Sequence, residues 1–238
     1  MSEQFSVIYE DRDLVVVNKS QGLLSQADMS RDPDLLTLLS KHYAEQNQAS
    51  RVYAVHRLDR GVGGLMVVAR TEKAAAKLSA AVSDHSGFVK EYLAVLHGVP
   101  DELSARLEDF LYHDARARKT ISVSRDDKRG KRAVLSYRVL DRVHLSETKS
   151  LALAIIRLET GRTHQIRAQF SSHGHPLAGD GRYGARDRYA DIALFSAHLS
   201  FVHPATGKRV SFCAQPEGSS AFSEFSISES LFERSLSE

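Results

Sequence analysis

One short stretch of the chain places a carboxylate among cations. It reads His56-Arg57-Leu58-Asp59-Arg60-Gly61-Val62-Gly63-Gly64 and lies between two β-like runs. Arg57 and Arg60 favour the ionised form of Asp59, which is the form that acts as a nucleophile or as a base. The same spacing is typical of a surface ion-pair loop, so the residues alone leave a catalytic and a structural interpretation open.

A second stretch, Gly161-Arg162-Thr163-His164-Gln165-Ile166-Arg167, combines cations with the expected start of a helix. We expect the Thr163 hydroxyl to cap this helix. Arg162, His164 and Arg167 would then gather around the first turn, where backbone N–H groups and the helix dipole favour an anion. A phosphate or a carboxylate would suit that position.

The histidines of this region raise a metal alternative with four candidate ligands: His164, His173, His175 and Asp180. His164 and His173 are nine residues apart on one expected helix, which corresponds to about 13 Å along the axis. Two ligands that far apart cannot share one ion. We therefore expect no metal, and a metal-dependent phosphoester hydrolase is the weakest of the functional alternatives.

These residues need a scaffold, and the chain reads as short strands with a few helices. Hydrophobic alternation predicts a hairpin of residues 7–9 and 14–17 and strands at 88–96, 134–143, 151–158, 195–202 and 210–213. Asp32 followed by Pro33 predicts one helix start, and Thr71 is expected to cap a second helix from Glu72 to about Ser83. Strands and helices do not alternate regularly, which predicts an α+β fold with a mainly antiparallel sheet.

Length and composition bound the class of protein. The 238 residues, 42% hydrophobic and 26% charged, are enough for a globular domain with a full core and exclude a disordered or fibrous chain. No apolar run approaches the roughly 18 residues of a membrane helix, and the N-terminus lacks a secretory signal pattern. The single cysteine, Cys213, excludes internal disulfides and agrees with a reducing compartment. We expect a cytoplasmic monomer that contacts no membrane.

The basic residues carry more information than the net charge of +2. The 32 basic residues divide into 10 lysines and 22 arginines. Arginine binds phosphate with two donors and stacks on bases, so this bias favours an RNA surface. From Arg116 to Arg132, eight basic residues accompany two acids, a local charge of +6. This basic segment is either an RNA contact or a solvated loop without a partner.

Taken together, these segments resemble the RluA-type pseudouridine synthases, which isomerise selected uridines in RNA. The resemblance spans about residues 8 to 216 and rests on motifs that occur in the family's order. They are His56 to Ala69, Lys90-Glu91-Tyr92-Leu93-Ala94, Gly161 to Arg167, Gly174 to Pro176 with Gly179 to Gly184, and His203 to Gly207. The resemblance implies a pseudouridine synthase fold, α+β with a mixed, mainly antiparallel sheet, flanking helices and a central catalytic cleft.

The resemblance also implies roles for individual residues. Asp59 would be the catalytic carboxylate, Arg167 its ion-pair partner, and Tyr92 the aromatic side chain that stacks on the target base. Arg57 would fill the gap that the extruded uridine leaves in the RNA. By its position alone, Tyr92 is a packing residue on a strand. The family needs no metal and no organic cofactor, and the sequence leaves open whether Asp59 acts as a nucleophile or as a base.

Two departures from the family pattern lie near Asp59. Val62-Gly63-Gly64 stands where the family usually has Thr-Ser-Gly, and Lys19-Ser20 where it usually has Lys-Pro. The loss of two hydroxyls removes possible hydrogen bonds, and the added glycine loosens the loop. These changes support one alternative from another class, a non-catalytic RNA-binding or RNA-remodelling protein that keeps the fold.

The expected domain organisation is a catalytic domain over residues 1–216 and a tail over 217–238. Eight serines and five glutamates place the tail outside the core. The tail's apolar side chains could instead dock a short helix on the body: Phe222, Phe225, Leu231 and Phe232. We expect no room before Val7 for the S4 RNA-binding domain of several relatives, so the RNA contacts would come from the catalytic domain.

The expected RNA is a stem-loop of tRNA or rRNA, because such RNA is recognised through shape and splayed bases. The residues expected to contact it are Arg57, Arg60, Arg162, His164, Lys131 and Arg132. The two last belong to the basic segment, which is the leading candidate for an RNA-contacting insertion or hairpin.

Overall fold

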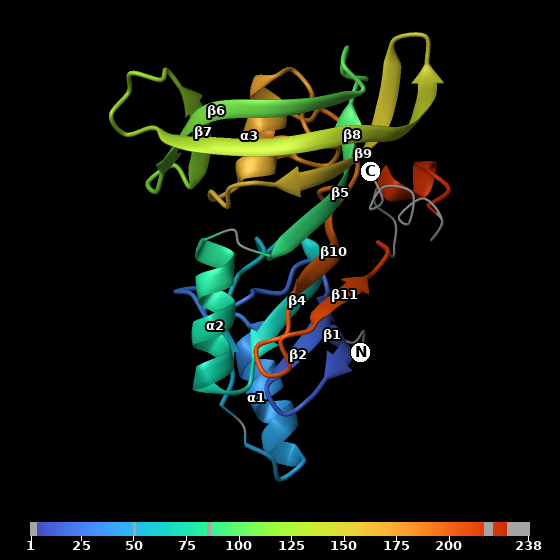
Figure 1. The fold of residues 1–238 in the computed structure, drawn as a ribbon. Coiled ribbons are helices and arrows are strands. Elements are labelled where there is room, and N and C mark those ends of the chain that lie inside the picture. The colour runs from blue at the N-terminus through green and yellow to red at the C-terminus, as the bar shows by residue number, and fades with distance from the viewer. Residues whose placement is uncertain (1–3, 50, 85–86, 217–220, 228–238) are drawn as a thin grey trace. The chain divides into compact units, whose positions relative to one another are not determined.

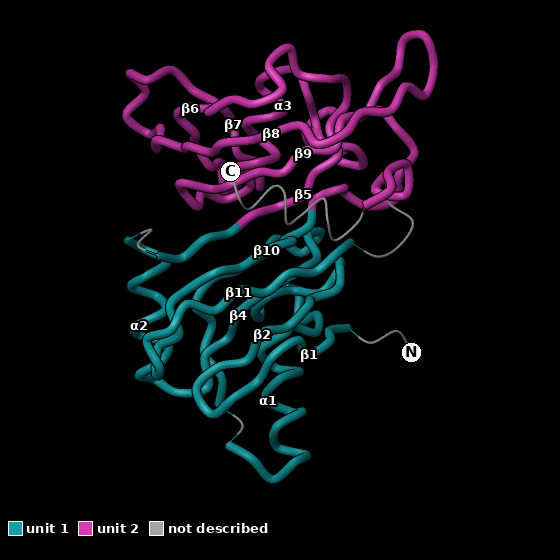
Figure 2. The backbone as a smooth tube through the Cα atoms, turned by 45° about the vertical axis from the view of Figure 1, so that its right-hand side comes forward, with its two compact units in different colours: residues 1–90, 195–216 teal, residues 91–194, 217–238 magenta. Residues whose placement is uncertain are grey.

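The computed structural model describes residues 4–49, 51–84, 87–216 and 221–227. The chain forms two compact units, which are coloured separately in Figure 2. Unit 1 contains residues 1–90 and 195–216, and unit 2 contains residues 91–194 and 217–238. The boundary between the units falls within β5 and again within β10, two strands that are labelled in Figure 1. None of the helices in the described ranges is long and apolar enough to span a membrane.

Unit 1 contains six strands and two helices. Its elements are β1 (Phe5–Glu10), β2 (Leu14–Lys19), α1 (Leu35–Glu45), β3 (Tyr53–Ala54), β4 (Gly63–Ala69), α2 (Glu72–Ser83), β10 (Leu194–Val202) and β11 (Arg209–Cys213). The strand order is β1-β2-β4-β10-β11, and β3 adds a short ladder to β4. β4 and β10 are parallel, and the other pairs of this sheet are antiparallel.

Continuous apolar runs explain why this sheet is covered on both faces. The residues of β2 from Leu14 to Val17 are fully buried, and so are those of β4 from Leu65 to Ala69. Ala74 and Leu78 of α2 pack against one face of the sheet, in a cluster that includes Val16 and Leu65. A strand that is buried on both faces carries apolar residues at successive positions, and both strands show this pattern.

The helix starts of unit 1 test two expectations. Thr71 caps α2 as predicted, since its hydroxyl accepts a hydrogen bond from the N–H of Ala74 at 3.2 Å. The prediction that the first helix starts at Asp32 and Pro33 was wrong, because Asp34 is the N-cap of α1 and accepts from the N–H of Thr37. Asp32 instead forms an ion pair with Arg60, a partner that local spacing does not reveal.

Unit 2 consists of antiparallel strands with one helix packed on them. Its elements are β5 (Val89–His97), β6 (Ser104–Asp114), β7 (Lys119–Val123), β8 (Lys131–Ser146), β9 (Lys149–Leu158), α3 (Gln165–Ser172), and the 3-10 turns η1 (Gly181–Tyr183) and η2 (Ala221–Glu224). The strand order is β5-β9-β8-β6-β7. The helix α3 packs on β6 and β8 through Ala168, which clusters with Leu111 and Ala133.

The strands β6 and β7 were not predicted from the sequence. Buried or half-buried residues of β6 alternate with exposed ones over most of its length. The exposed positions carry charged groups such as Glu108, so the apolar signal of the strand is diluted. The basic segment 116–132 consists of the β6–β7 turn, β7, the following turn and the start of β8. Because β6 and β7 pair as antiparallel strands, this arrangement agrees with the hairpin expected for the segment.

The described part of the tail belongs to unit 2. Phe222 and Phe225 are buried around η2, and the Tyr189 hydroxyl donates to a carboxylate oxygen of Glu224 at 3.0 Å. These contacts agree with the docking alternative for residues 221–227. Leu231 and Phe232 lie outside the described residues.

Gly64 is the glycine with the strictest requirement in unit 1. It has a φ of +110°, and a Cβ there would lie 2.3 Å from the carbonyl oxygen of Ser196 on β10. That contact is with backbone in a parallel ladder, so neither partner can move aside without breaking the ladder. The close β4–β10 pairing therefore depends on glycine at this position.

We predict that Gly64→Ala lowers the free energy of unfolding by about 3 kcal/mol or more, since it adds backbone strain to the clash. Urea denaturation of purified protein measures the change. Gly181→Ala is the matched control because a Cβ at Gly181 meets nothing within 4 Å. Equal losses in the two variants would contradict the proposed role of the β4–β10 contact.

Candidate active site

The candidate carboxylate Asp59 lies in a turn of unit 1 between β3 and β4. The N–H of Val62 donates to the Asp59 carbonyl at 3.0 Å and closes the turn. The Val62 side chain is buried, so the departure from threonine at this position adds to the core. The turn therefore forms without the hydroxyl that the sequence lacks.

The segment 20–25 holds this turn from one side. The N–H of Gly22 donates to the Arg60 carbonyl at 2.8 Å, and the Arg60 Nε donates to the Gly22 carbonyl at 3.0 Å. The amide of Gln21 donates to the Gly61 carbonyl at 3.0 Å. A Cβ at Gly63 would lie 3.1 Å from the Gln21 Cγ, so the glycine at this position leaves space for the Gln21 side chain.

Ser25 fixes the residue that precedes Asp59. Its hydroxyl donates to the Leu58 carbonyl at 2.7 Å and accepts from the Leu58 N–H at 3.0 Å. Ser25 and Leu58 are both about 95% buried, so these hydrogen bonds are shielded from water. The backbone on both sides of Asp59 is thus held by side chains that lie more than 30 residues away in sequence.

Lys19 places a buried ammonium near Asp59. It is fully buried, and its Nζ donates to the carbonyls of Leu23 at 2.7 Å and Ser20 at 3.1 Å. Burial lowers the pKa of Lys19 to about 8, while the Asp59 carboxylate opposes that change.

His56 serves the strand that follows it. Its Nε2 accepts a hydrogen bond from the N–H of Val67 at 3.1 Å, so this nitrogen carries no proton. Burial, together with the charge of Lys90, lowers the pKa of His56 to about 3. The imidazole therefore stays neutral at physiological pH and supports β4 rather than supplying a proton.

The second candidate region lies in unit 2 and centres on Arg167. Its Nε and Nη2 donate to the two carboxylate oxygens of Asp180 at 2.7 and 2.9 Å, and both side chains are at least 92% buried. The Arg167 Cζ also lies 4.8 Å from the centre of the Tyr183 ring. A guanidinium held by a two-point pair and an aromatic face has a fixed orientation.

The start of α3 differs from the prediction. Thr163 does not cap the helix; His164 is the N-cap, with a φ of +52° and no side-chain cap hydrogen bond. Gln165 takes the structural role, since its Oε1 accepts from the Arg162 N–H and the Thr160 hydroxyl. Its amide donates to the carbonyl of Val134 on β8, which ties the helix start to the sheet.

Arg162, His164 and Arg167 each have a separate partner within the protein. These contacts do not favour the predicted gathering of the three side chains around an external anion. The Nδ1 of His164 pairs with the Tyr183 hydroxyl at 2.9 Å. The Nε of Arg162 donates to the Arg132 carbonyl at 3.0 Å. Arg167 already holds an internal carboxylate, that of Asp180.

Tyr92 lies on the α3 face of the sheet in unit 2. It is opposite Ile156 on β9, and Ile156 is opposite Tyr137 on β8, so the three side chains share one face. The Tyr137 ring makes an edge contact with Phe170 of α3, with ring centres 5.2 Å apart. Tyr92 and the helix that carries Arg167 are therefore on the same side of this sheet.

The histidine-rich segment does not gather its donors. His173 Nε2 pairs with Asp109 at 3.1 Å, and His175 Nδ1 donates to the carbonyl of His97 at 3.0 Å. His164 and Asp180 have the partners described above, Tyr183 and Arg167. Within the described part of the chain, no group of three or more histidine, cysteine, aspartate or glutamate side chains is placed to hold a metal ion.

Some of the residues expected to contact RNA are exposed, and others are paired with groups of the protein. Arg57 is exposed, and Arg60 is fixed by Gly22 and Asp32. Arg132 forms a two-point pair with Glu108, both distances being 2.8 Å. Lys131 is exposed and makes no ion pair with a described residue.

The predicted site residues lie in two units, and the residues that hold the Asp59 turn were not predicted. Asp59 belongs to unit 1, while Tyr92 and Arg167 belong to unit 2. The expected pair between Asp59 and Arg167 stays a prediction. The missed residues are Ser25 and Gln21, and no local pattern marks them because their partners lie in another segment.

Comparisons with known proteins agree on one family. Residues 13–172 match the family model of RNA pseudouridylate synthase. A ribosomal large subunit pseudouridine synthase D of Zymomonas mobilis is 37% identical over 224 residues, which is 88% of this chain and 68% of that protein. An uncharacterized RNA pseudouridine synthase of Bacillus subtilis is 34% identical over 212 residues, covering 87% of this chain and 67% of the relative.

A solved structure also resembles the chain. Human RNA pseudouridylate synthase domain containing 1 has a TM-score of 0.74 and 25% identity, covering 90% of this chain and 84% of that one. The mixed, mainly antiparallel α+β fold expected from the sequence is confirmed by this similarity. The chain spans about two thirds of the length of the curated relatives above.

We predict that Ser25→Ala lowers the free energy of unfolding by about 1 to 3 kcal/mol, because it leaves the buried Leu58 N–H without its acceptor. Hydrogen exchange measures the local effect, and the Leu58 and Val62 amides should exchange faster. Ser6→Ala is the control, since Ser6 is exposed on β1. Unchanged exchange at both amides would contradict the role of Ser25 in holding the turn.

Proposed function

The chain belongs to the RNA pseudouridylate synthase family and is an isomerase that acts on RNA, and we propose that Asp59 is its catalytic carboxylate. The observation that carries this proposal is the turn at Asp59, held at Leu58, Arg60 and Gly61 by hydrogen bonds from the segment 20–25. Fixed geometry of this kind is what a reacting group needs. The buried Lys19 ammonium supports this role because it places a positive charge near the carboxylate.

The proposed reaction breaks the bond between C1′ of the ribose and N1 of uracil. The base then turns, C5 bonds to C1′, the C5 proton leaves, and N1 regains a proton, so no electrons are gained or lost. Asp59 either adds to the uracil ring or the ribose as a nucleophile, or removes a ribose proton as a base.

Two residues of unit 2 have proposed supporting roles. Tyr92 would stack on the extruded uracil, because an aromatic face holds a base without reading its edge. Arg167, whose orientation the pair with Asp180 fixes, would be the ion-pair partner of Asp59. Arg57, exposed two residues before Asp59, would occupy the space that the uridine leaves in the RNA.

We propose a uridine in structured RNA as the substrate, with ribosomal RNA as the first candidate and tRNA as the second. Ribosomal RNA comes first because several relatives are named as synthases of the large ribosomal subunit. We also propose a cytoplasmic monomer that needs no metal or organic cofactor. The non-catalytic alternative loses its main support, because Val62 and Gly63 fit the packed turn.

We predict that the protein releases tritium from total tRNA or rRNA labelled at C5 of uridine, and that Asp59→Asn lowers the rate by about a thousandfold or more. The label must leave C5 when the new bond forms there. RNA binding by the variant is the control and should persist. Release by Asp59→Asn at the native rate would contradict the catalytic role, and no release by either protein would favour a binding protein.

The basic segment gives a second test of RNA contact. Each lost phosphate contact flattens the dependence of log affinity on log salt by about 0.7 to 0.9. We predict that Lys131→Ala flattens it by that amount, whereas Arg129→Ala changes it less, because Asp127 already pairs with Arg129 at 2.7 Å. Binding measured across a salt series checks both. Equal slopes in the native protein and Lys131→Ala would make Lys131 a bystander.

A further inference from the structure

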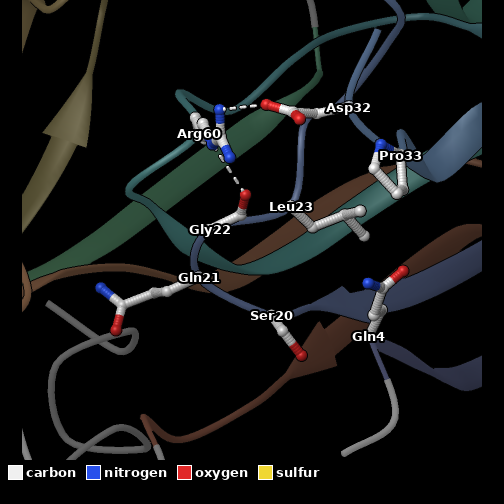
Figure 3. Close-up of a pocket in the computed structure, with 8 residues that line it drawn as sticks. All are labelled: Gln4, Ser20, Gln21, Gly22, Leu23, Asp32, Pro33 and Arg60. Carbon is white, nitrogen blue, oxygen red and sulfur yellow. Dashed lines mark hydrogen bonds and ion pairs between the residues drawn. The ribbon is translucent and has the colours of Figure 1, made fainter. Parts of the chain in front are cut away.

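A polar pocket opens in unit 1 beside the turn that carries Asp59. Its volume is about 260 Å³, and its wall is formed by residues of four segments, among them Gln4, Gln21, Asp32 and Arg60. Figure 3 shows Arg60 bridging from Gly22 to Asp32 at the edge of this pocket. Gln21 and Arg60 also hold the Asp59 turn, whereas the catalytic role proposed for Asp59 assigns no part to Gln4.

The charges in the pocket favour an uncharged ligand. The Arg60 Nη1 and the Asp32 carboxylate are 2.6 Å apart and offset each other. The Arg60 Nε is bound to the Gly22 carbonyl, so the guanidinium is fixed on two sides. A phosphate would lie near the Asp32 carboxylate as well as near the cation, which lowers the attraction for an anion.

The other residues that line the pocket suit a flat ring that has polar groups along its edge. Gln4 and Gln21 carry amides and Ser20 a hydroxyl, which supply both donors and acceptors. Leu23 and Pro33 supply apolar surface. Nucleobases combine apolar faces with donors and acceptors on their edges, and proteins read splayed RNA bases through such edges. The volume lies just below the range of about 300 to 1,000 Å³ for drug-sized ligands, which suits a ligand as small as one base.

We propose that this pocket binds the base of the nucleotide adjoining the target uridine. The proposal rests on the proposed function, because Arg60 follows Asp59 directly and consecutive Cα atoms are about 3.8 Å apart. We place the bound base next to the target nucleotide because Arg60, which lines the pocket, directly follows Asp59 in the chain. Ser20, which stands where the family usually has proline, adds a hydroxyl to the lining and gives this chain its own specificity.

The test is a binding selection that does not require turnover. Stem-loop RNAs carry one loop uridine with three randomised nucleotides on each side, and the bound fraction is sequenced near half-saturation. We expect the native protein to enrich one base at an adjoining position by about fivefold or more, the effect of one good base contact. No enrichment at either adjoining position would overturn the proposal.

Two variants and one control connect that preference to the pocket. Ser20→Leu fills the pocket, and Gln4→Ala removes an amide that makes no side-chain hydrogen bond with a described residue, so at least one variant should keep the fold. Both should reduce the enrichment to less than about twofold, while Gln46→Ala, an exposed amide at the end of α1 outside the pocket, should keep it. Native enrichment in both pocket variants would overturn the proposal.

Tritium release by the same proteins separates this proposal from the proposed function. A native protein that releases tritium but enriches no adjoining base retains the function without the pocket. A protein that enriches an adjoining base but releases no tritium retains a base-binding pocket without the isomerase activity.

Discussion

The hydrogen bonds between residues 20–25 and residues 58–61 are the constraint on which unit 1 depends for its chemistry. The eight residues between β3 and β4 have many accessible conformations, and each one directs the Asp59 carboxylate differently. Ser25 binds both backbone groups of Leu58, and Gly22 and Arg60 exchange two hydrogen bonds. The cost of ordering the turn is thus met during folding, before RNA binds. The proposed base pocket uses the same residues, so substrate reading and carboxylate positioning share one scaffold.

Gly64 extends that constraint into the sheet. The strand β4 begins directly after the Asp59 turn, and it can pair closely with β10 only because position 64 has no side chain. Lys19 ends β2, which pairs with the other edge of β4, and its ammonium is directed toward the carbonyls of the segment 20–25. The central strands of unit 1 therefore fix where the turn begins and ends, and they place the Lys19 ammonium near it.

In unit 2, contacts with distant residues hold the Arg167 side chain in one orientation. Arg167 is buried, and a buried guanidinium is tolerated only when its donors are satisfied. Asp180 supplies two acceptors and Tyr183 an aromatic face, while the Tyr183 hydroxyl accepts from the Thr120 N–H at 2.8 Å and pairs with His164. The motifs that look like separate signals in the sequence form one connected structure in unit 2. Similar ion pairs occur among exposed arginines, where Glu108 pairs with Arg132 and Asp127 pairs with Arg129.

The sequence by itself determined the residue types, the family, most strands and the α2 cap, because these depend on local periodicity, on side-chain chemistry and on motifs in a fixed order. Tertiary structure decided which groups are partners. Asp180 binds Arg167, Ser25 holds Leu58, Asp32 binds Arg60 and Gln165 replaces Thr163 at the start of α3. Hydrogen bonds and ion pairs act over a few ångströms, and strand register and topology bring distant segments within that range. Linear spacing contains neither register nor topology, so it marks candidate side chains without identifying what holds them.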